Sequence, residues 1–247
     1  MELFQLSGRT ALVTGGTRGI GLALAKGFKK AGARVWIHGS KEESTREIAA
    51  EHGFLWVSGN LKDSRSLMPM IDKIADGEEC LDILVNNAGS ENHSQIAKAD
   101  EDFLDDIYNI NAKSAFLFVR HLLPLLQKSP HASIINVTSI HQTVPMKTAS
   151  SYCMSKASLA MFSKVAALEF AELGIRVNNL APGAIETDIN REVIKNMPFD
   201  QWIPMGRVGR PEELIGPAIF LASDASSYMT GATIFVDGGY KENLLRY

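Results

Sequence analysis

Tyr152 and Lys156 are four residues apart in Ser-Ser-Tyr-Cys-Met-Ser-Lys, a segment rich in helix-compatible residues. Residues four apart on a helix share one face, so the two side chains are expected to be neighbours. A tyrosine hydroxyl has an ordinary pKa of about 10, and a nearby ammonium favours its ionised form. The pair therefore has the chemistry of an acid/base group. A helix with one aromatic residue and one surface lysine is the alternative interpretation.

Ser139 ends the run Ser-Ile-Ile-Asn-Val-Thr-Ser, which begins at Ser133. The run predicts a strand, and its last residue then lies at the carboxyl edge of the sheet, where open α/β sheets bind ligands. A serine just beyond a strand is more often a turn former than a catalyst. From the residues alone, both interpretations stay open.

Four glycines lie in Thr-Gly-Gly-Thr-Arg-Gly-Ile-Gly, which covers residues 14–21. A predicted strand precedes this segment and a predicted helix, Leu22–Lys30, follows it, so helix amides there can bind a pyrophosphate. Side chains at Gly15 or Gly19 would keep the backbone from a dinucleotide, and Gly21 permits close helix–strand packing. An ordinary glycine-rich turn is the alternative, since the spacing differs from GxGxxG.

Short β-branched runs alternate with helical segments, which predicts an α/β domain with a parallel sheet covered by helices on both faces. The expected strands are Thr10–Val13, Arg34–Ile37, Ile83–Asn86, Ser133–Val137, Arg176–Leu180 and Thr233–Val236, and the first long helix is expected over Gly19–Ala31. Gly32 and Gly174 are expected as left-handed helix caps. The chain has 247 residues, 45% of them hydrophobic, and one domain over 1–247 is expected. An irregular stretch at about 186–211 predicts a mobile substrate loop.

Composition excludes several classes of function. The net charge of −3 offers no basic field for nucleic acid or an anionic membrane surface. Cys80 and Cys153 lack the spacing of metal ligands and are expected as buried packing residues, so no metal is expected and a reducing compartment is indicated. No signal peptide or membrane span is evident, which predicts a cytoplasmic protein.

The glycine segment, Ser139 and Tyr-x-x-x-Lys together resemble the short-chain dehydrogenase/reductase family. Three further segments are similar to that family: Asn-Asn-Ala-Gly at 86–89, Asn111 in Asn-Ile-Asn-Ala-Lys, and Pro-Gly-Ala-Ile-Glu-Thr at 182–187. The similarity runs nearly from end to end of the chain and closes with the segment Met229–Gly239. The resemblance implies a seven-stranded Rossmann-like doubly wound sheet, a nicotinamide cofactor and usually a homotetramer.

The resemblance also implies a role for each catalytic position. Ser139 hydrogen-bonds the carbonyl oxygen of the substrate, and Tyr152 transfers the proton. Lys156 lowers the pKa of the tyrosine and holds the nicotinamide ribose. Asn111 distorts its helix and holds a water linked to the lysine.

Contacts with the cofactor are implied at a larger set of positions, which includes Tyr152 and Lys156. The others are Gly15, Thr17, Arg18, Gly19, Ile20, Gly39, Ser40, Lys41, Asn60, Leu61, Asn87, Ala88, Gly89, Pro182, Gly183, Ile185 and Thr187. Asn60 stands where many relatives have an aspartate that accepts from adenine, and an asparagine carbonyl can still accept. Ser139, Tyr152, His93 and His141 are the expected substrate contacts, with solvated loop histidines as the alternative for the last two.

The phosphorylated cofactor NADP(H) is expected to be preferred, with NAD(H) possible as a second cofactor. Relatives that prefer NAD have an acid at the end of the second strand, where this chain has Gly39. Arg18 and Lys41 are placed to approach a 2′-phosphate, and a guanidinium can bind it with two hydrogen bonds. Solvated loop cations are the alternative, and Ser40 stands where some NADP-preferring relatives have arginine.

The substrate is expected to be a small polar ketone or alcohol, such as a sugar, sugar acid or polyol, because the chain looks similar to gluconate 5-dehydrogenases. A 3-oxoacyl-acyl-carrier-protein reductase is the second reading. Those reductases usually carry arginines near the active-site entrance, whereas the matching stretches here are 128–132 and 172–174. A non-catalytic dinucleotide-binding protein is a third and more remote interpretation. A homotetramer is expected because the predicted helix Ser151–Phe170 is apolar around much of its circumference, although deep burial within one chain fits the same pattern.

Overall fold

The computed structural model describes residues 2–188 and 190–243. Its centre is a seven-stranded parallel sheet in the order β3-β2-β1-β4-β5-β6-β7. The strands are β1 (Thr10–Val13), β2 (Arg34–Gly39), β3 (Leu55–Ser58), β4 (Ile83–Asn86), β5 (Ser133–Val137), β6 (Arg176–Pro182) and β7 (Thr233–Val236). This is a Rossmann-like doubly wound single domain, as the alternation of strands and helices predicted.

The helices are α1 (Gly19–Lys30), α2 (Glu42–His52), α3 (Leu67–Gly77), α4 (Glu101–Tyr108), α5 (Ser114–Leu126), α6 (Ser150–Phe170), α7 (Arg191–Lys195), α8 (Phe199–Trp202) and α9 (Ile215–Ala222). A π-helical turn over Asn109–Lys113 joins α4 to α5. Short 3₁₀ turns include Glu2–Phe4, Ser64–Ser66, Ile96–Lys98, Ile140–Gln142, Ala171–Leu173, Pro211–Leu214 and Asp224–Ser226.

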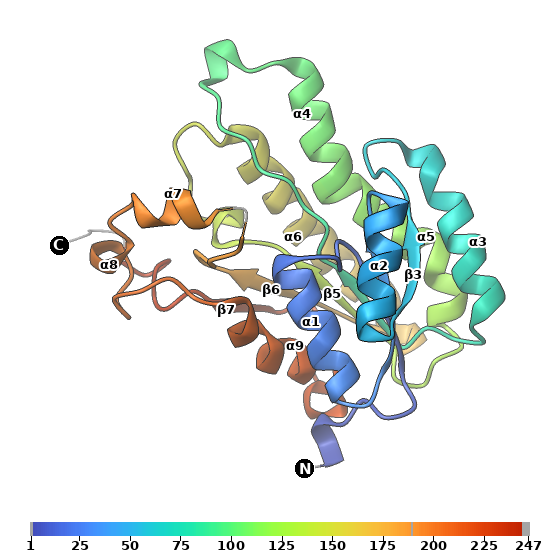
Figure 1. Cartoon of the computed structure of the whole chain (residues 1–247). Helices are drawn as coiled ribbons and strands as arrows, with labels where there is room; N and C mark the ends of the chain where they lie inside the picture. Colours follow the sequence, from blue (N-terminus) through green and yellow to red (C-terminus); the bar gives the residue numbers. More distant parts are fainter. Residues whose placement is uncertain (1, 189, 244–247) are drawn as a thin grey trace.

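Two hydrophobic layers cover the two faces of the sheet, because successive residues of a strand point to opposite sides. Ala11 and Val13 of β1 pack with Phe28 of α1 and with α2 and α9, while Leu12 packs with Phe118 of α5 and with α3 and α6. Figure 1 shows α1 and α9 on one side of the strands and α3 and α5 on the other. The five interior strands are almost wholly buried, as a parallel sheet covered on both faces requires, whereas the edge strands β3 and β7 are mostly half-buried.

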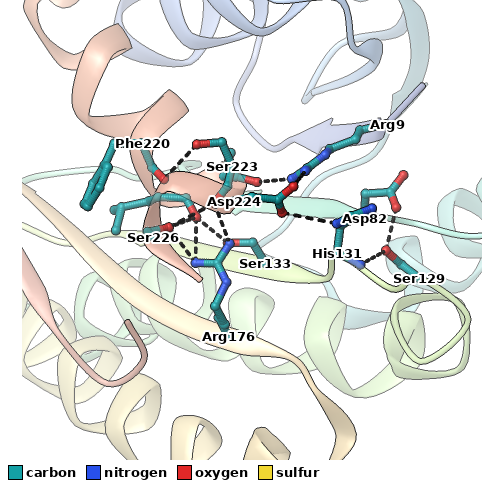
Figure 2. A network of polar contacts seen from close by, with 12 residues as sticks. Arg9, Asp82, Ser129, His131, Ser133, Arg176, Phe220, Ser223, Asp224 and Ser226 are labelled. Atoms are coloured by element: carbon teal, nitrogen blue, oxygen red, sulfur yellow. Dashed lines mark hydrogen bonds and ion pairs between the residues drawn. The ribbon is translucent and has the colours of Figure 1, made fainter. Parts of the chain in front are cut away.

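The carboxyl-terminal end of α9 is fixed by two arginines from other elements (Figure 2). Arg9 donates to the carbonyl of Ala222 at 2.9 Å and pairs with Asp224 at 2.8 Å. Arg176, at the start of β6, donates to the carbonyl of Leu221 at 3.0 Å. The last carbonyls of a helix lack intrahelical partners and carry partial negative charge, so two guanidinium groups stabilise this end.

Several details depart from the expectation. β3 was not among the runs read as strands, because only Val57 of its four residues is β-branched. Cys80 and Cys153 are free and half-buried rather than buried. The stretch 186–211 is not wholly irregular, because α7 and α8 lie within it. Gly32 and Gly174 do adopt left-handed backbone, with φ of 100° and 72°.

Candidate active site

The segments singled out in the sequence meet at the carboxyl edge of the sheet. They follow β1, β2, β3, β4, β5 and β6 in turn, and parallel strands bring those ends together. Tyr152 and Lys156 come to the same edge from the first turns of α6. The stretches 128–132 and 172–174 instead precede β5 and β6, at the opposite edge. The expectation that these two stretches border the entrance to the active site is therefore wrong for the active site of the same chain.

Tyr152 and Lys156 lie on one face of α6, as their spacing predicted. The Lys156 Nζ lies 5.8 Å from the centre of the Tyr152 ring. Lys156 is 4% exposed, and its Nζ donates to the carbonyl of Val137, the last residue of β5, at 2.9 Å. A buried ammonium with a single backbone acceptor is poorly solvated. It can therefore bind further acceptors such as ribose hydroxyls.

The two groups have shifted proton affinities. Burial lowers the pKa of Lys156 to about 8, and the negative charge of Glu91 partly offsets that effect. Burial also raises the pKa of the Tyr152 hydroxyl, a hydrogen bond from Ser139 opposes this rise, and Glu91 adds to it. Burial is the largest influence on the pKa of the Tyr152 hydroxyl, and the lowering of that pKa by Lys156 stays a prediction.

Ser139 is buried just beyond β5 and begins the 3₁₀ turn Ile140–Gln142. Its Oγ accepts from the amide of His141 at 3.1 Å, so its hydroxyl proton is available as a donor, to Tyr152 or to a substrate oxygen. The His141 ring packs edge-on to Tyr152 at 6.2 Å between centres. Its Nδ1 lies 2.9 Å from the carbonyl of Val144, so the neutral ring carries its proton there and its Nε2 remains an acceptor.

Asn111 is 1% exposed and lies in the π-helical turn, so the helix is distorted where the resemblance implied. Its side-chain oxygen accepts from the amide of Ser90 at 2.8 Å, and its Nδ2 donates to the carbonyl of Ser90 at 2.8 Å. The same Nδ2 donates to Ser155 Oγ in α6 at 2.9 Å. Asn111 therefore ties the loop after β4 to the helix that carries Tyr152 and Lys156.

The segment Ser90–Ser94, here called the strap, was not fully recognised from the sequence. Asn92 accepts from Ser151 Oγ at 2.7 Å, and the Ser94 amide donates to the carbonyl of Thr148 at 2.7 Å. His93 is half-exposed, and its ring nitrogens lie 2.9 Å from Glu91 and 3.2 Å from Thr148 Oγ1. The strap thus runs beside the start of α6, and only His93 within it was predicted.

The glycine-rich loop fits a dinucleotide. A Cβ added at Gly15 would lie 2.9 Å from the Ala88 Cα, and one at Gly21 would lie 2.2 Å from the Gly15 carbonyl oxygen. The backbone is therefore packed so closely that side chains are excluded at Gly15 and Gly21 by the protein itself, while the predicted approach of a dinucleotide to Gly15 and Gly19 stays a prediction. The first amides of α1 have no side-chain cap, and such amides bind anions. Thr17, Arg18, Gly19 and Ile20 all lie in this loop and first turn.

The remaining predicted cofactor positions border this loop. A Cβ added at Gly39 would lie 2.6 Å from Thr17 Cγ2, so the end of β2 touches the glycine-rich loop. Ser40 and Lys41 follow, with Lys41 exposed before α2. Asn60 Oδ1 accepts from the Lys62 amide at 3.1 Å, and a carbonyl oxygen keeps a second lone pair. Leu61 is buried beside it.

Two more backbone segments complete the border. Asn87 Nδ2 donates to the carbonyl of Thr14 at 2.8 Å, which fixes the segment Asn87–Gly89 against the glycine-rich loop. A Cβ added at Gly89 would lie 3.5 Å from Lys156 Nζ. After β6, Pro182 and Gly183 lead to Ile185, which bridges to Gly209, and to Thr187, whose methyl group faces Gly19.

Comparison with known proteins agrees with this geometry. The model of a family described as enoyl-(acyl carrier protein) reductase matches residues 15–241. Gluconate 5-dehydrogenase of Gluconobacter oxydans is 33% identical, with 98% of each chain covered. A 3-oxoacyl-[acyl-carrier-protein] reductase of Chlamydia pneumoniae is 38% identical, with 95% of this chain and 97% of the relative covered. A gluconate 5-dehydrogenase from Burkholderia cenocepacia, solved with NADP and tartrate, has a TM-score of 0.90 at 34% identity, with 98% of both chains covered.

The chain belongs to the short-chain dehydrogenase/reductase family. Within this family, the chain has comparable sequence identity to a relative named for a sugar acid and to one named for an acyl carrier protein. In the described part of the chain, no three His, Cys, Asp or Glu side chains gather as a metal site would require. Nor does any described helix have the length and apolar character to cross a membrane.

Proposed function

We propose that this short-chain dehydrogenase/reductase interconverts a ketone and a secondary alcohol, with Tyr152 as the acid/base. The observation that carries the proposal is the convergence of Ser139, Tyr152, Lys156 and Asn111 at the sheet edge that holds the glycine-rich loop. A bound nicotinamide dinucleotide supplies or accepts the hydride. The intact set of four residues argues against a non-catalytic binding protein.

The residues of the chain perform the remaining steps in the direction of reduction. Ser139 donates its free hydroxyl proton to the carbonyl oxygen, which polarises the carbonyl bond. Tyr152 then gives its phenolic proton to the alkoxide oxygen that develops there. The tyrosinate that remains must be stabilised, and the Lys156 ammonium is the nearby charge of the right sign. Asn111 positions Lys156 through the loop and α6, and a water on its backbone would return the proton.

Within this function we propose a small polyhydroxylated substrate, a sugar or polyol in preference to a sugar acid. His141 offers an Nε2 acceptor beside Tyr152. A substrate hydroxyl group would donate to it. The carboxylate of Glu91 acts electrostatically on both Tyr152 and Lys156, which disfavours an anionic substrate. The phosphopantetheine arm of an acyl carrier is also anionic, so that reading stays second.

A panel of carbonyl compounds tests the substrate class. We expect kcat/KM for neutral hydroxyketones to exceed that for acetoacetyl-4′-phosphopantetheine by at least about tenfold, with 5-ketogluconate between them. Glu91→Gln should reduce the difference in kcat/KM between the neutral hydroxyketones and 5-ketogluconate. Glu101→Gln, in the exposed first turn of α4, is the matched control and should leave that difference unchanged. A preference for the acyl thioester would make the carrier-protein reductase the better assignment.

We propose NADP(H) as the preferred cofactor. A Cβ at Gly39 would lie 2.2 Å from Thr45 Oγ1, so this position resists the acid that binds a 2′-hydroxyl. Arg18 and Lys41 are exposed, and their side-chain nitrogens have no hydrogen-bond or ion-pair partner among the described residues, so both can bind a 2′-phosphate. One charge-assisted contact can supply about 1.4 kcal/mol, which is tenfold in affinity.

We expect wild type to favour NADPH over NADH at least about tenfold in kcat/KM, and Arg18→Ala and Lys41→Ala to lose most of that ratio. Lys128→Ala, an exposed lysine at the opposite sheet edge, is the matched control. Preference for NADH, or an unchanged ratio in both variants, would refute the assignment.

We propose self-association as a homotetramer, in which the face formed by α4, α5 and α6 makes one of the interfaces between copies. Leu159 is buried within the chain, whereas Met161, Val165 and Leu168 on the same helix are 58%, 47% and 81% exposed. A groove of about 190 Å³ next to them is lined by residues that include Tyr108 and Phe116. Such an apolar face indicates a protein partner, and a second copy offers the same face.

Light scattering at micromolar concentration should give four copies, and Leu168→Glu should shift the protein to a smaller species. Glu172→Leu, on the turn after α6, is a control that should leave the mass unchanged. A monomeric wild type would contradict the proposal. The cytoplasmic location stays a prediction.

A further inference from the structure

His38 is a buried titratable residue that the catalytic scheme does not use. It is the fifth of six residues in β2 and is 2% exposed. Its ring packs edge-on to Phe118 of α5, with 6.1 Å between ring centres. A buried imidazole needs partners for both nitrogens, because an unsatisfied polar group in the interior is costly.

The two ring nitrogens of His38 are satisfied by two different loops. The amide of Gly15 donates to Nδ1 at 3.3 Å, and Nε2 lies 3.0 Å from the carbonyl of Gly59. Because an amide can only donate and a carbonyl can only accept, the ring is neutral with its proton on Nε2. His38 therefore has one tautomer in this fold.

These two loops flank the place proposed for the adenosine half of the cofactor. Gly15 has a φ of 63° and opens the glycine-rich loop, while Gly59 precedes Asn60, the position that the family uses for adenine. The main chain of β2 contacts the same loops, since Gly16 donates to the carbonyl of His38 at 2.9 Å and Gly59 donates to that of Gly39 at 3.1 Å. The imidazole adds a side-chain link between the two loops, across β2.

We propose that His38 is a positioning residue for the dinucleotide, its neutral ring holding the Gly15 and Gly59 loops at the separation that the adenosine half requires. This inference rests on the proposed cofactor-dependent function. His38 then affects the affinity for the cofactor, while the residues around Tyr152 carry out the chemical step.

The surroundings of His38 keep the ring neutral. The groups packed on it are the Gly15 amide, the Gly59 carbonyl and the Phe118 ring, none of which titrates. Burial lowers the pKa of His38, the bond to Gly59 only partly opposes this, and no described charged side chain contributes. A proton on Nδ1 would face the Gly15 amide, donor against donor, and would force that loop to move.

Substitutions that keep or remove the Nδ1 acceptor test the inference. His38→Asn places an amide oxygen where Nδ1 lies, whereas His38→Leu fills similar volume without an acceptor. We expect His38→Leu to raise the Kd for NADPH at least about tenfold and to raise the cofactor KM in parallel, with kcat at saturating cofactor within about twofold. His38→Asn should bind NADPH within about threefold of wild type.

If His38→Leu does not fold, His38→Gln replaces it. Its amide lies one bond further out, near Nε2, so the Gly15 amide again loses its acceptor and the same rise in Kd is expected. Equal losses in the Asn variant and in the variant without the acceptor would mean general packing and would overturn the inference. An unchanged Kd for NADPH in the variant without the acceptor would also overturn the inference. A fall in kcat with an unchanged cofactor KM in that variant would overturn it as well. A wild type that binds neither NADPH nor NADH would refute the proposed function as well, which separates the two failures.

Discussion

Tyr152→Phe is expected to lower kcat/KM by about three orders of magnitude or more, since it removes the proton that the proposed mechanism transfers to the alkoxide. The phenylalanine ring keeps the edge-on contact with His141. Ser139 Oγ keeps the hydrogen bond from the His141 amide. Cofactor Kd and Tm should therefore stay near the wild-type values, and steady-state kinetics beside a binding titration measure both.

Tyr108→Phe is the matched control for this variant. Tyr108 ends α4 and is 45% exposed, and its hydroxyl makes only a long contact of 3.4 Å with Ser158. Its loss should leave kcat/KM within about twofold. Substantial turnover by a folded Tyr152→Phe protein would remove Tyr152 from the role of acid/base.

Lys156→Met is expected to separate stability from activity. The variant should lose at least about two orders of magnitude in kcat/KM, because the tyrosinate loses its nearby cation. At neutral pH the free energy of unfolding without cofactor should rise by about 2 kcal/mol. The fall in the pKa of Lys156 from 10.5 to about 8 corresponds to roughly 3 kcal/mol of unfavourable burial, and the lost bond to Val137 offsets about 1 kcal/mol.

The sign of the pH dependence follows from the same shift. The folded protein binds the Lys156 proton more weakly than the unfolded chain, so the burial of Lys156 destabilises wild type fully below pH 8. The destabilisation shrinks as pH rises from about 8 and vanishes near the ordinary pKa of 10.5. Denaturant unfolding of both proteins across this range should show the stability gap closing. A variant less stable than wild type at pH 7 would contradict the account.

Local sequence patterns were enough to predict most of the fold. Runs of β-branched residues marked six of the seven strands. Five of these are interior strands, which a parallel sheet buries on both sides, and the sixth is the edge strand β7, Thr-Ile-Phe-Val. β3, at the other edge, is Leu-Trp-Val-Ser, in which only Val57 is β-branched, so it gave no comparable signal. Two short helices in 186–211 were also missed, since α7 and α8 have only five and four residues.

The site was predictable where chemistry depends on residue type and spacing, as for Ser139 and the Tyr152–Lys156 pair. It was not predictable where it depends on long-range contacts. The hydrogen bond between Asn92 and Ser151 joins residues 59 positions apart, and no local pattern marks it. Proton affinities were also beyond the sequence, because the burial that raises the pKa of Tyr152 is a property of the packed fold.

Hydride tracing tests the central claim most directly. The enzyme is incubated with hydroxyketones and NADPH or NADH carrying deuterium at the transferable position of the nicotinamide, and the products are analysed by mass spectrometry. The account predicts an alcohol with one deuterium on the carbinol carbon, formed by wild type and not by Tyr152→Phe. Absence of a labelled alcohol from every carbonyl compound tested with either cofactor, by a folded protein, would contradict it.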